Sequence, residues 1–85
     1  MKASVGRIVH YKTTEEDREV FRNQQATGSG CNVQDVLPAI VVSVHDEEGT
    51  LVNLKVIVDG ELTGRWVTSI SQGKEEGNWD WPERV

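Results

Sequence analysis

The middle of the chain carries the feature that most constrains its fold, two consecutive stretches rich in β-branched residues. The first covers residues 37–45 and the second covers residues 50–58, with the sequence DEEG between them. The second stretch alternates strictly, and one of its faces carries Val52, Leu54, Val56 and Val58. A period of two is typical of strands that bury one face, and a short polar segment ending in glycine is typical of a turn. The two stretches therefore predict a β-hairpin.

Three further strands are predicted around this hairpin. Residues 5–12 are rich in β-forming side chains, and residues 78–81 form a short last strand before a proline. Residues 65–70 read as another strand. The dipeptide Asp59-Gly60 favours a tight turn before it, although Gly64 leaves open a wider connection. The chain thus predicts five strands.

One helix and one loop are predicted between the first strand and the hairpin. Thr14 can cap a helix over residues 15–23, whose first turn is acidic and therefore suits the positive end of the helix dipole. Val20 and Phe21 are its only large apolar side chains, so the helix can cover one edge of a core. Residues 24–36 combine glycine and serine without periodicity and predict a flexible loop.

These elements together predict a single domain over residues 1–85. Five short strands, tight hairpins and one long excursion are typical of a mainly β fold, a small, strongly bent antiparallel barrel of the SH3-like type with one short helix between strands 1 and 2. Such a sheet closes when its last strand returns beside its first. We therefore expect the C-terminal strand to be structural.

The charge balance and the single cysteine argue against several classes of protein. Nine Lys and Arg against fourteen Asp and Glu give a net charge of -5, which disfavours non-specific binding to nucleic acid or anionic lipid. No apolar run approaches the ~18 residues of a membrane span, and no signal-peptide block begins the chain. Cys31 alone cannot form an internal disulfide. We expect a cytoplasmic protein without cofactor or metal.

The two tryptophans near the end of the chain admit more than one interpretation. Residues two apart in a strand face the same side, so Trp79 and Trp81 form a shelf. The favoured interpretation is that the pair plugs the barrel or a subunit contact, because each indole buries a large apolar area. The pair can instead stack a planar ligand such as a nucleobase, or line a peptide groove.

Trp66 and the basic residues of the strands complete the candidate binding set. Arg65 and Trp66 are adjacent in a strand, so at most one of them is buried, and the favoured interpretation puts Trp66 in the core. Side chains able to meet a phosphate come from predicted strands, whereas Lys74 lies on a loop. These strand-borne cations are Arg7, Lys12, Lys55 and Arg65.

Other patterns give no support for an enzyme. His10 and His45 lie on different predicted strands without a nucleophile that the sequence can place beside them. The acidic run 46–48 lacks the pattern of a calcium loop, and residues 28–30 lack the lysine of a phosphate-binding loop. Cys31 has no spaced histidine partner. We therefore expect no catalytic residues.

Several motifs, taken together in order, resemble one group of proteins. These are VGRIVHYKTTEED, LPAIVVSV, VNLKVIVDG, WVTSISQG and GNWDWPERV. The chain resembles short accessory proteins of bacteriophages and prophages that open with GRIVHYK, often continue with T-E-x-D and end with W-x-W-P. The match covers most of the chain except residues 24–36. The resemblance implies a protein made in the cytoplasm of an infected bacterium, and it implies no catalytic residues.

This setting leads to one principal hypothesis and two rivals. The principal hypothesis is a non-enzymatic homo-oligomer that sequesters an anionic nucleotide-like signal of host defence, by analogy with other small phage proteins. Its base would stack on Trp66, Trp79 or Trp81, and its phosphates would pair with the four strand-borne cations. The first rival is a protein-interaction or virion-associated module with the tryptophans as anchors. The second is a decoy that presents acidic residues 15–17 and 46–48 to a DNA-binding host enzyme.

Overall fold

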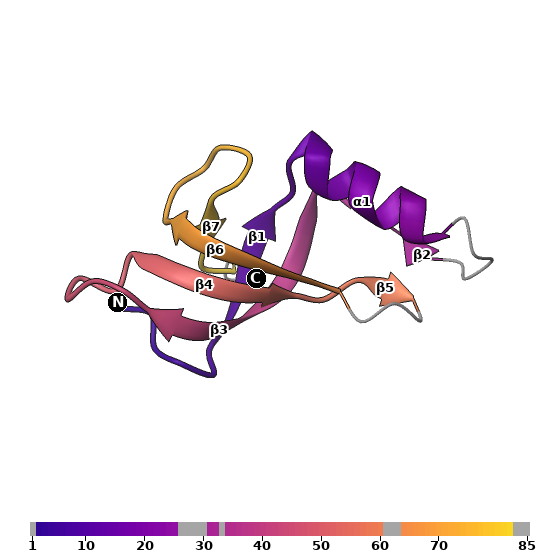
Figure 1. Cartoon of the computed structure of the whole chain (residues 1–85). Coiled ribbons are helices and arrows are strands. Elements are labelled where there is room, and N and C mark those ends of the chain that lie inside the picture. The colour runs from indigo at the N-terminus through magenta and orange to yellow at the C-terminus, as the bar shows by residue number, and fades with distance from the viewer. Residues whose placement is uncertain (1, 26–30, 33, 61–63, 83–85) are drawn as a thin grey trace.

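The computed structural model of the chain describes residues 2–25, 31–32, 34–60 and 64–82 (Figure 1). Its elements follow one another in the order β1 (Ile8–Lys12), α1 (Glu15–Gln25), β2 (Cys31–Asn32), β3 (Val36–Val44), β4 (Leu51–Val56), β5 (Asp59–Gly60), β6 (Arg65–Ser71) and β7 (Trp79–Asp80). The predicted hairpin is confirmed as β3 and β4, which pair antiparallel from Ala39 opposite Val56 to Val44 opposite Val52.

Five of these strands form one antiparallel sheet in the order β6-β4-β3-β1-β7. Along the chain, α1 lies between β1 and β3, the first two strands that enter this sheet. This confirms the predicted mainly β fold. β7 pairs with β1, with Tyr11 opposite Trp79, so the end of the chain returns beside the first strand as expected. An isolated parallel bridge between Gln72 and Trp79 links the segment after β6 to β7. The sheet thus curls into a half-barrel (Figure 1).

Two irregularities bend the sheet. The register between β3 and β4 shifts between Val41 and Ser43, which leaves Val42 as the extra residue of a bulge. The register between β4 and β6 also shifts, and Ser69 there has a positive φ of 55°. Its N–H donates to the side-chain Oδ1 of Asn53 at 2.9 Å, which holds this uncommon conformation. Because bulges increase local twist, these two sites favour curling over a flat sheet.

The connection between β4 and β6 differs from the predicted tight turn. Asp59 and Gly60 form β5, which pairs antiparallel with β2, so the prediction of a two-residue turn at this dipeptide is wrong. The wider connection ends at Gly64, whose φ is +93° and whose position leaves no room for a Cβ beside the carbonyl oxygen of Val56. The dipeptide alone could not show that β2, from a distant part of the chain, pairs with it.

The predicted loop over residues 24–36 is only partly within the described residues. α1 extends two residues beyond its predicted end, to Gln25, and β3 begins at Val36. Cys31 and Asn32 form β2. Residues 26–30 and 33, where flexibility was predicted, lie outside the described residues.

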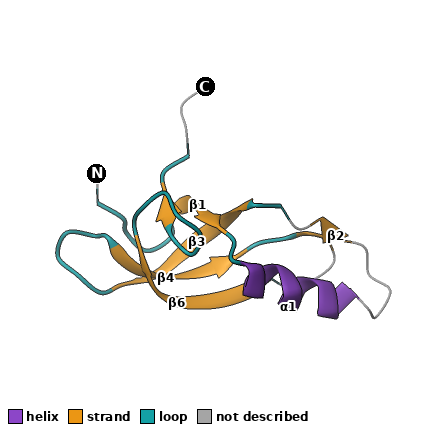
Figure 2. Ribbon diagram, turned by 90° about the horizontal axis from the view of Figure 1, so that it is seen from above, coloured by secondary structure: helices purple, strands orange, loops and turns teal. Residues whose placement is uncertain are grey.

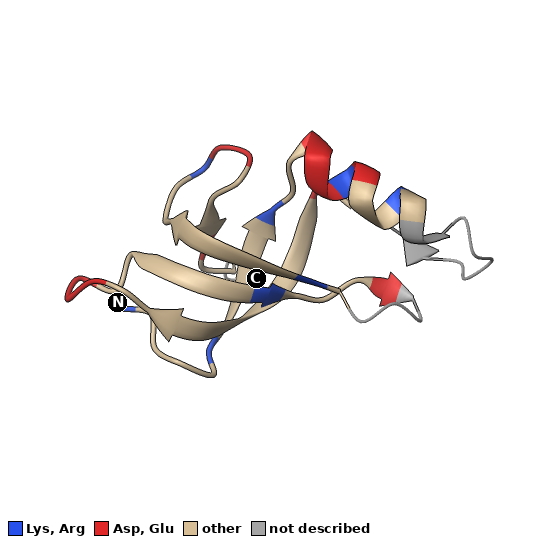
Figure 3. Ribbon diagram, in the orientation of Figure 1, with Lys and Arg blue, Asp and Glu red and all other residues tan. Residues whose placement is uncertain are grey.

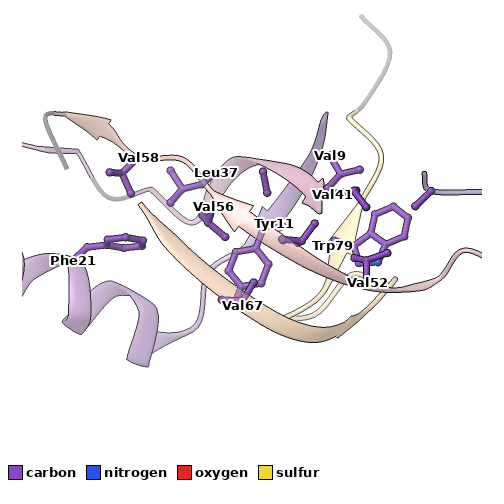
Figure 4. Close-up of a cluster of buried hydrophobic side chains, with 13 residues drawn as sticks. Val9, Tyr11, Phe21, Leu37, Val41, Val52, Val56, Val58, Val67 and Trp79 are labelled. Atoms are coloured by element: carbon purple, nitrogen blue, oxygen red, sulfur yellow. The ribbon is translucent and has the colours of Figure 1, made fainter. Parts of the chain in front are cut away.

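The core lies inside the curled sheet and is closed at one end by α1 (Figure 2). The predicted inner face of the second hairpin strand is buried, as is Phe21 of the helix. Figure 4 shows Phe21 reaching from α1 toward Val58, and Trp79 packed beside Val41 and Val52. Alternation therefore identified the buried face correctly on the hairpin, and the helix contributes one large side chain, as expected.

α1 is eleven residues long and largely polar, and no helix in the described ranges is long and apolar enough to cross a lipid bilayer.

Candidate functional site

The structure distributes the seven residues predicted to bind a ligand among the core, an ion pair and two exposed surfaces. These residues are Arg7, Lys12, Lys55, Arg65, Trp66, Trp79 and Trp81.

Trp79 belongs to the core. Its side chain is fully buried, and its indole Nε1 donates to the carbonyl oxygen of Thr50 at 2.9 Å. The ring of Trp81 meets it edge-on, with centroids 5.4 Å apart and planes at 86°, a favourable aromatic geometry. The interpretation of Trp79 as a structural plug is therefore confirmed, and its ring offers no exposed face to a ligand.

Trp81 is only partly buried and lies between the core and the surface. The guanidinium carbon of Arg7 is 5.4 Å from the centroid of its ring, which is the geometry of a cation–π contact. Arg7, from the turn before β1, is thus brought to the end of the chain. The structure thus brings these two predicted site residues together in contact with each other.

Arg65 points inward and Trp66 points outward, so the favoured interpretation of this pair is wrong. Arg65 lies opposite Val56, whose side chain is buried, and Trp66 lies opposite the exposed Lys55. Trp66 is 57% exposed. The reversal is possible because the Arg65 Nη1 lies 3.0 Å from Oδ1 of the buried Asp17, which supplies the opposite charge that this half-buried arginine needs.

The Asp17 carboxylate is the centre of a buried polar cluster. Its Oδ2 accepts hydrogen bonds from the Tyr11 hydroxyl at 2.6 Å and from the Thr14 N–H at 2.8 Å. The Asp17 N–H in turn donates to Oγ1 of Thr14 at 3.1 Å, which completes a capping box at the start of α1. Burial, followed by the hydrogen bond to Asp17, raises the pKa of Tyr11 well above its ordinary value. This cluster attaches the helix to the sheet, and it withdraws Asp17 from the acidic surface proposed for a decoy.

A hollow of about 580 Å³ lies at the edge of the sheet where β1 meets β7. Its lining includes His10, Lys12, Val36, Lys74, Asp80 and Trp81. β1 supplies His10 and Lys12 from alternate positions on the face away from the core, and the segment after β6 supplies Lys74. Two of the predicted site residues, Lys12 and Trp81, therefore meet in one cavity.

Charges in the hollow are arranged asymmetrically. Lys74 forms an ion pair with Asp80, whose Oδ1 also accepts from Gln72 at 3.1 Å and from the Trp81 N–H at 2.9 Å. The Lys74 ammonium and these other donors lower the pKa of Asp80 to about 2. Lys12 instead donates to the neutral carbonyl of Lys74 at 3.3 Å and forms no ion pair within the described part of the chain. Lys12 is thus the cation here whose charge is not already matched by a carboxylate.

The other members of this hollow were not selected from the sequence. His10 was expected to be a strand-surface or core residue without a catalytic role, although its spacing from Lys12 indicated a shared face. Lys74 and Asp80 carried no such signal, because the loop that folds Lys74 back toward β7 has no periodicity and is held by hydrogen bonds among its own residues. These include the bond that the Asn78 side chain donates to the carbonyl of Ser71 at 3.1 Å.

The remaining polar candidates have structural contacts. His45 Nε2 lies 2.8 Å from Oδ1 of Asn53. The Asp46 carboxylate accepts from the backbone N–H groups of Leu51 at 3.0 Å and Thr50 at 2.8 Å, and from the Thr50 hydroxyl, and these hydrogen bonds lower its pKa to about 2. Among the described residues, no three His, Cys, Asp or Glu side chains gather as metal ligands. The acidic turn therefore acts as a cap for the hairpin.

Comparison with known proteins adds no further assignment, since no family model, curated protein or solved structure matches the chain.

Proposed function

We propose that the protein is a non-enzymatic binding protein that holds a small anionic, nucleotide-like ligand in the hollow between β1 and β7. The observation that carries the proposal is the meeting of Lys12 and Trp81 there, one chosen from the sequence as a phosphate partner and the other as a stacking residue. The volume of the hollow lies in the range of small-molecule sites.

The two sides of the hollow suit the two parts of such a ligand. Lys12 and His10 project from β1 and offer an ammonium group and an imidazole to a phosphate. Trp81 and Val36 offer apolar surface to a planar base. Asp80, held ionised beside Lys74, disfavours a second phosphate on its side. The arrangement therefore favours a ligand with its negative charge concentrated at one end.

The biological form of this proposal is sequestration. The resemblance to phage accessory proteins suggests a signal of host defence as the ligand, trapped in the bacterial cytoplasm without being altered. An assembly of several copies would raise the capacity for ligand, and the expected native mass exceeds that of one subunit. No group in the hollow is assigned a bond-breaking role.

Thermal unfolding with a panel of cyclic nucleotides and ADP-ribose derivatives tests the proposal. One class of ligand is expected to raise the Tm progressively, by about 10 °C or more at roughly 100 times its Kd. Lys12→Ala is expected to weaken binding about tenfold or more, because a charge-assisted hydrogen bond is lost. Lys2→Ala removes the same charge outside the hollow and serves as the control.

Two results would refute it. The first is an unchanged Tm with every member of the panel, and the second is equal affinity in the Lys12→Ala and Lys2→Ala variants. Mass spectrometry of the released ligand tests the non-enzymatic part separately, since a chemically altered ligand contradicts sequestration.

A further inference from the structure

The face of the sheet that points away from the core is unusually apolar. Cross-strand pairing aligns Ile8 with Ile40, Ile40 with Lys55 and Lys55 with Trp66, which makes one row across four strands. A neighbouring row aligns Asp80 with His10 and His10 with Pro38, whose carbonyl oxygen accepts from the N–H of Ile57. We call these rows, together with Val36 at the start of β3, the outer face.

Most of the exposed large apolar side chains gather on this face. Within the described residues, six such side chains are exposed, and four of them project from the outer face. They are Ile8 (50% exposed), Val36 (43%), Ile57 (41%) and Trp66 (57%). Val42 (39%) is the extra residue of the bulge in β3, and only Val5 lies away from the sheet. A contiguous apolar surface of this kind is typical of an interaction site.

The longest row of the outer face carries a positive charge although the chain as a whole is acidic. The Lys55 side chain stands between Ile40 and Trp66, and no ion pair joins it to a described residue. Most acidic side chains lie on α1, on the 46–48 turn, on the loop at 75–76 and on β5 (Figure 3). In the neighbouring row, Asp80 lies opposite His10 and is paired with Lys74. In a chain with a net charge of -5, the row from Ile8 to Trp66 therefore combines apolar side chains with one positive charge.

We propose that the outer face binds a partner protein that presents apolar side chains flanked by carboxylates. Trp66 would enter an apolar pocket of the partner, since tryptophan is enriched among the residues that contribute most to the affinity of such interfaces. Lys55, one position across the sheet, would pair with a carboxylate at the edge of that pocket. Val36 also lines the hollow, but the row from Ile8 to Trp66 does not, so this proposal does not depend on the ligand assigned to the hollow.

Charge decides between this partner and two other occupants. Two copies of the chain packed face to face about a twofold axis that runs along the row would set their Lys55 ammonium groups opposite one another, which is unfavourable. Single-stranded nucleic acid binds on successive aromatic side chains, whereas the outer face has one aromatic ring among aliphatic ones. A protein surface with apolar and acidic side chains complements both the apolar side chains of the outer face and the positive charge of Lys55.

Selection from a random peptide library displayed on phage, with the intact protein as bait, tests the proposal. We expect enriched peptides to combine aromatic or aliphatic residues with Asp or Glu. Binding of a synthetic enriched peptide should shift the Trp66 emission to shorter wavelength. It should weaken at least about tenfold in Trp66→Ser and in Lys55→Glu. Lys2→Glu makes the same charge reversal off the face and should bind the peptide as the native protein does.

Each alternative gives a different result with the same variants. Static light scattering that finds a dimer abolished by Trp66→Ser would assign the face to a second copy and overturn the proposal. Binding of a labelled oligothymidine that Trp66→Ser abolishes would overturn it in favour of nucleic acid. Peptides rich in Lys or Arg, or no enrichment, would also overturn it. Circular dichroism melts of Trp66→Ser and Lys55→Glu should show folded proteins, since both side chains are exposed.

Discussion

Replacing Tyr11 with phenylalanine removes one hydroxyl from the buried cluster that joins α1 to the sheet. Tyr11 is 3% exposed, and its hydroxyl donates to an Asp17 oxygen at 2.6 Å. A hydrogen bond to a charged group contributes about 1.5–3 kcal/mol. Asp17 keeps its contacts to Thr14 and Arg65, so we expect the lower part of this range, about 1.5–2 kcal/mol. For a domain of this size the Tm should fall by about 6–16 °C.

Urea denaturation followed by tryptophan fluorescence measures this change as a lower midpoint with an unaltered m-value. The same measurement on Glu16→Ala supplies the control, because Glu16 is also near Arg65, at 3.9 Å, but its side chain is 81% exposed. An exposed ion pair contributes about 0–1 kcal/mol, so this variant should be much less affected.

The Asp17→Ala background makes the test specific. There Arg65 loses its buried partner, which should cost about 3 kcal/mol or more, and the Tyr11 hydroxyl has lost its acceptor. Adding Tyr11→Phe to Asp17→Ala should therefore be neutral or stabilising, because it removes an unsatisfied polar group. The explanation is refuted if Tyr11→Phe costs the same in both backgrounds, or less than about 0.5 kcal/mol in the native one.

Two further predictions concern the core and the hairpin turn. Trp79→Ala should destabilise the domain by about 3–5 kcal/mol, whereas Trp66→Ala should change its stability little, and equal thermal shifts for the two variants would contradict their assignment to core and surface. Hydrogen bonds from Leu51 and Thr50 lower the pKa of Asp46 from 3.8 to about 2 in the folded state. The Asp46 carboxylate therefore contributes its full stabilisation above pH 3.8, and this contribution is lost as the pH falls to about 2. Asp46→Asn should lower the Tm at pH 7 and flatten the acid limb of a Tm-against-pH curve, and parallel curves would contradict this reasoning.

Several of the motifs quoted from the sequence are explained by folding. Tyr11 of the opening GRIVHYK donates to Asp17 of the following TEED, and Thr14 of the same segment caps α1. Trp79 of the closing WDWP fills the core. These residues therefore stabilise the fold. Lys12 and Trp66 are better candidates for ligand contacts, because their side chains make no contact in the core.

The strands and their buried faces could be read from the sequence, because alternation is a local property. A residue at every second position meets the same side whatever the rest of the chain does. The hairpin at 37–58 was predicted for this reason, whereas the helix cap at Thr14 followed from its side-chain type and the return of the last strand from closure of the sheet.

The directions of Arg65 and Trp66, and the contents of the hollow, were decided by tertiary structure alone. Either residue could have turned inward on local grounds, and Arg65 does so because Asp17, far away in the chain, supplies a buried negative charge. Lys74 reaches Asp80 only after the loop between them folds back. Short-range patterns determine which residues share a face, whereas long-range pairing of charges determines which face turns inward.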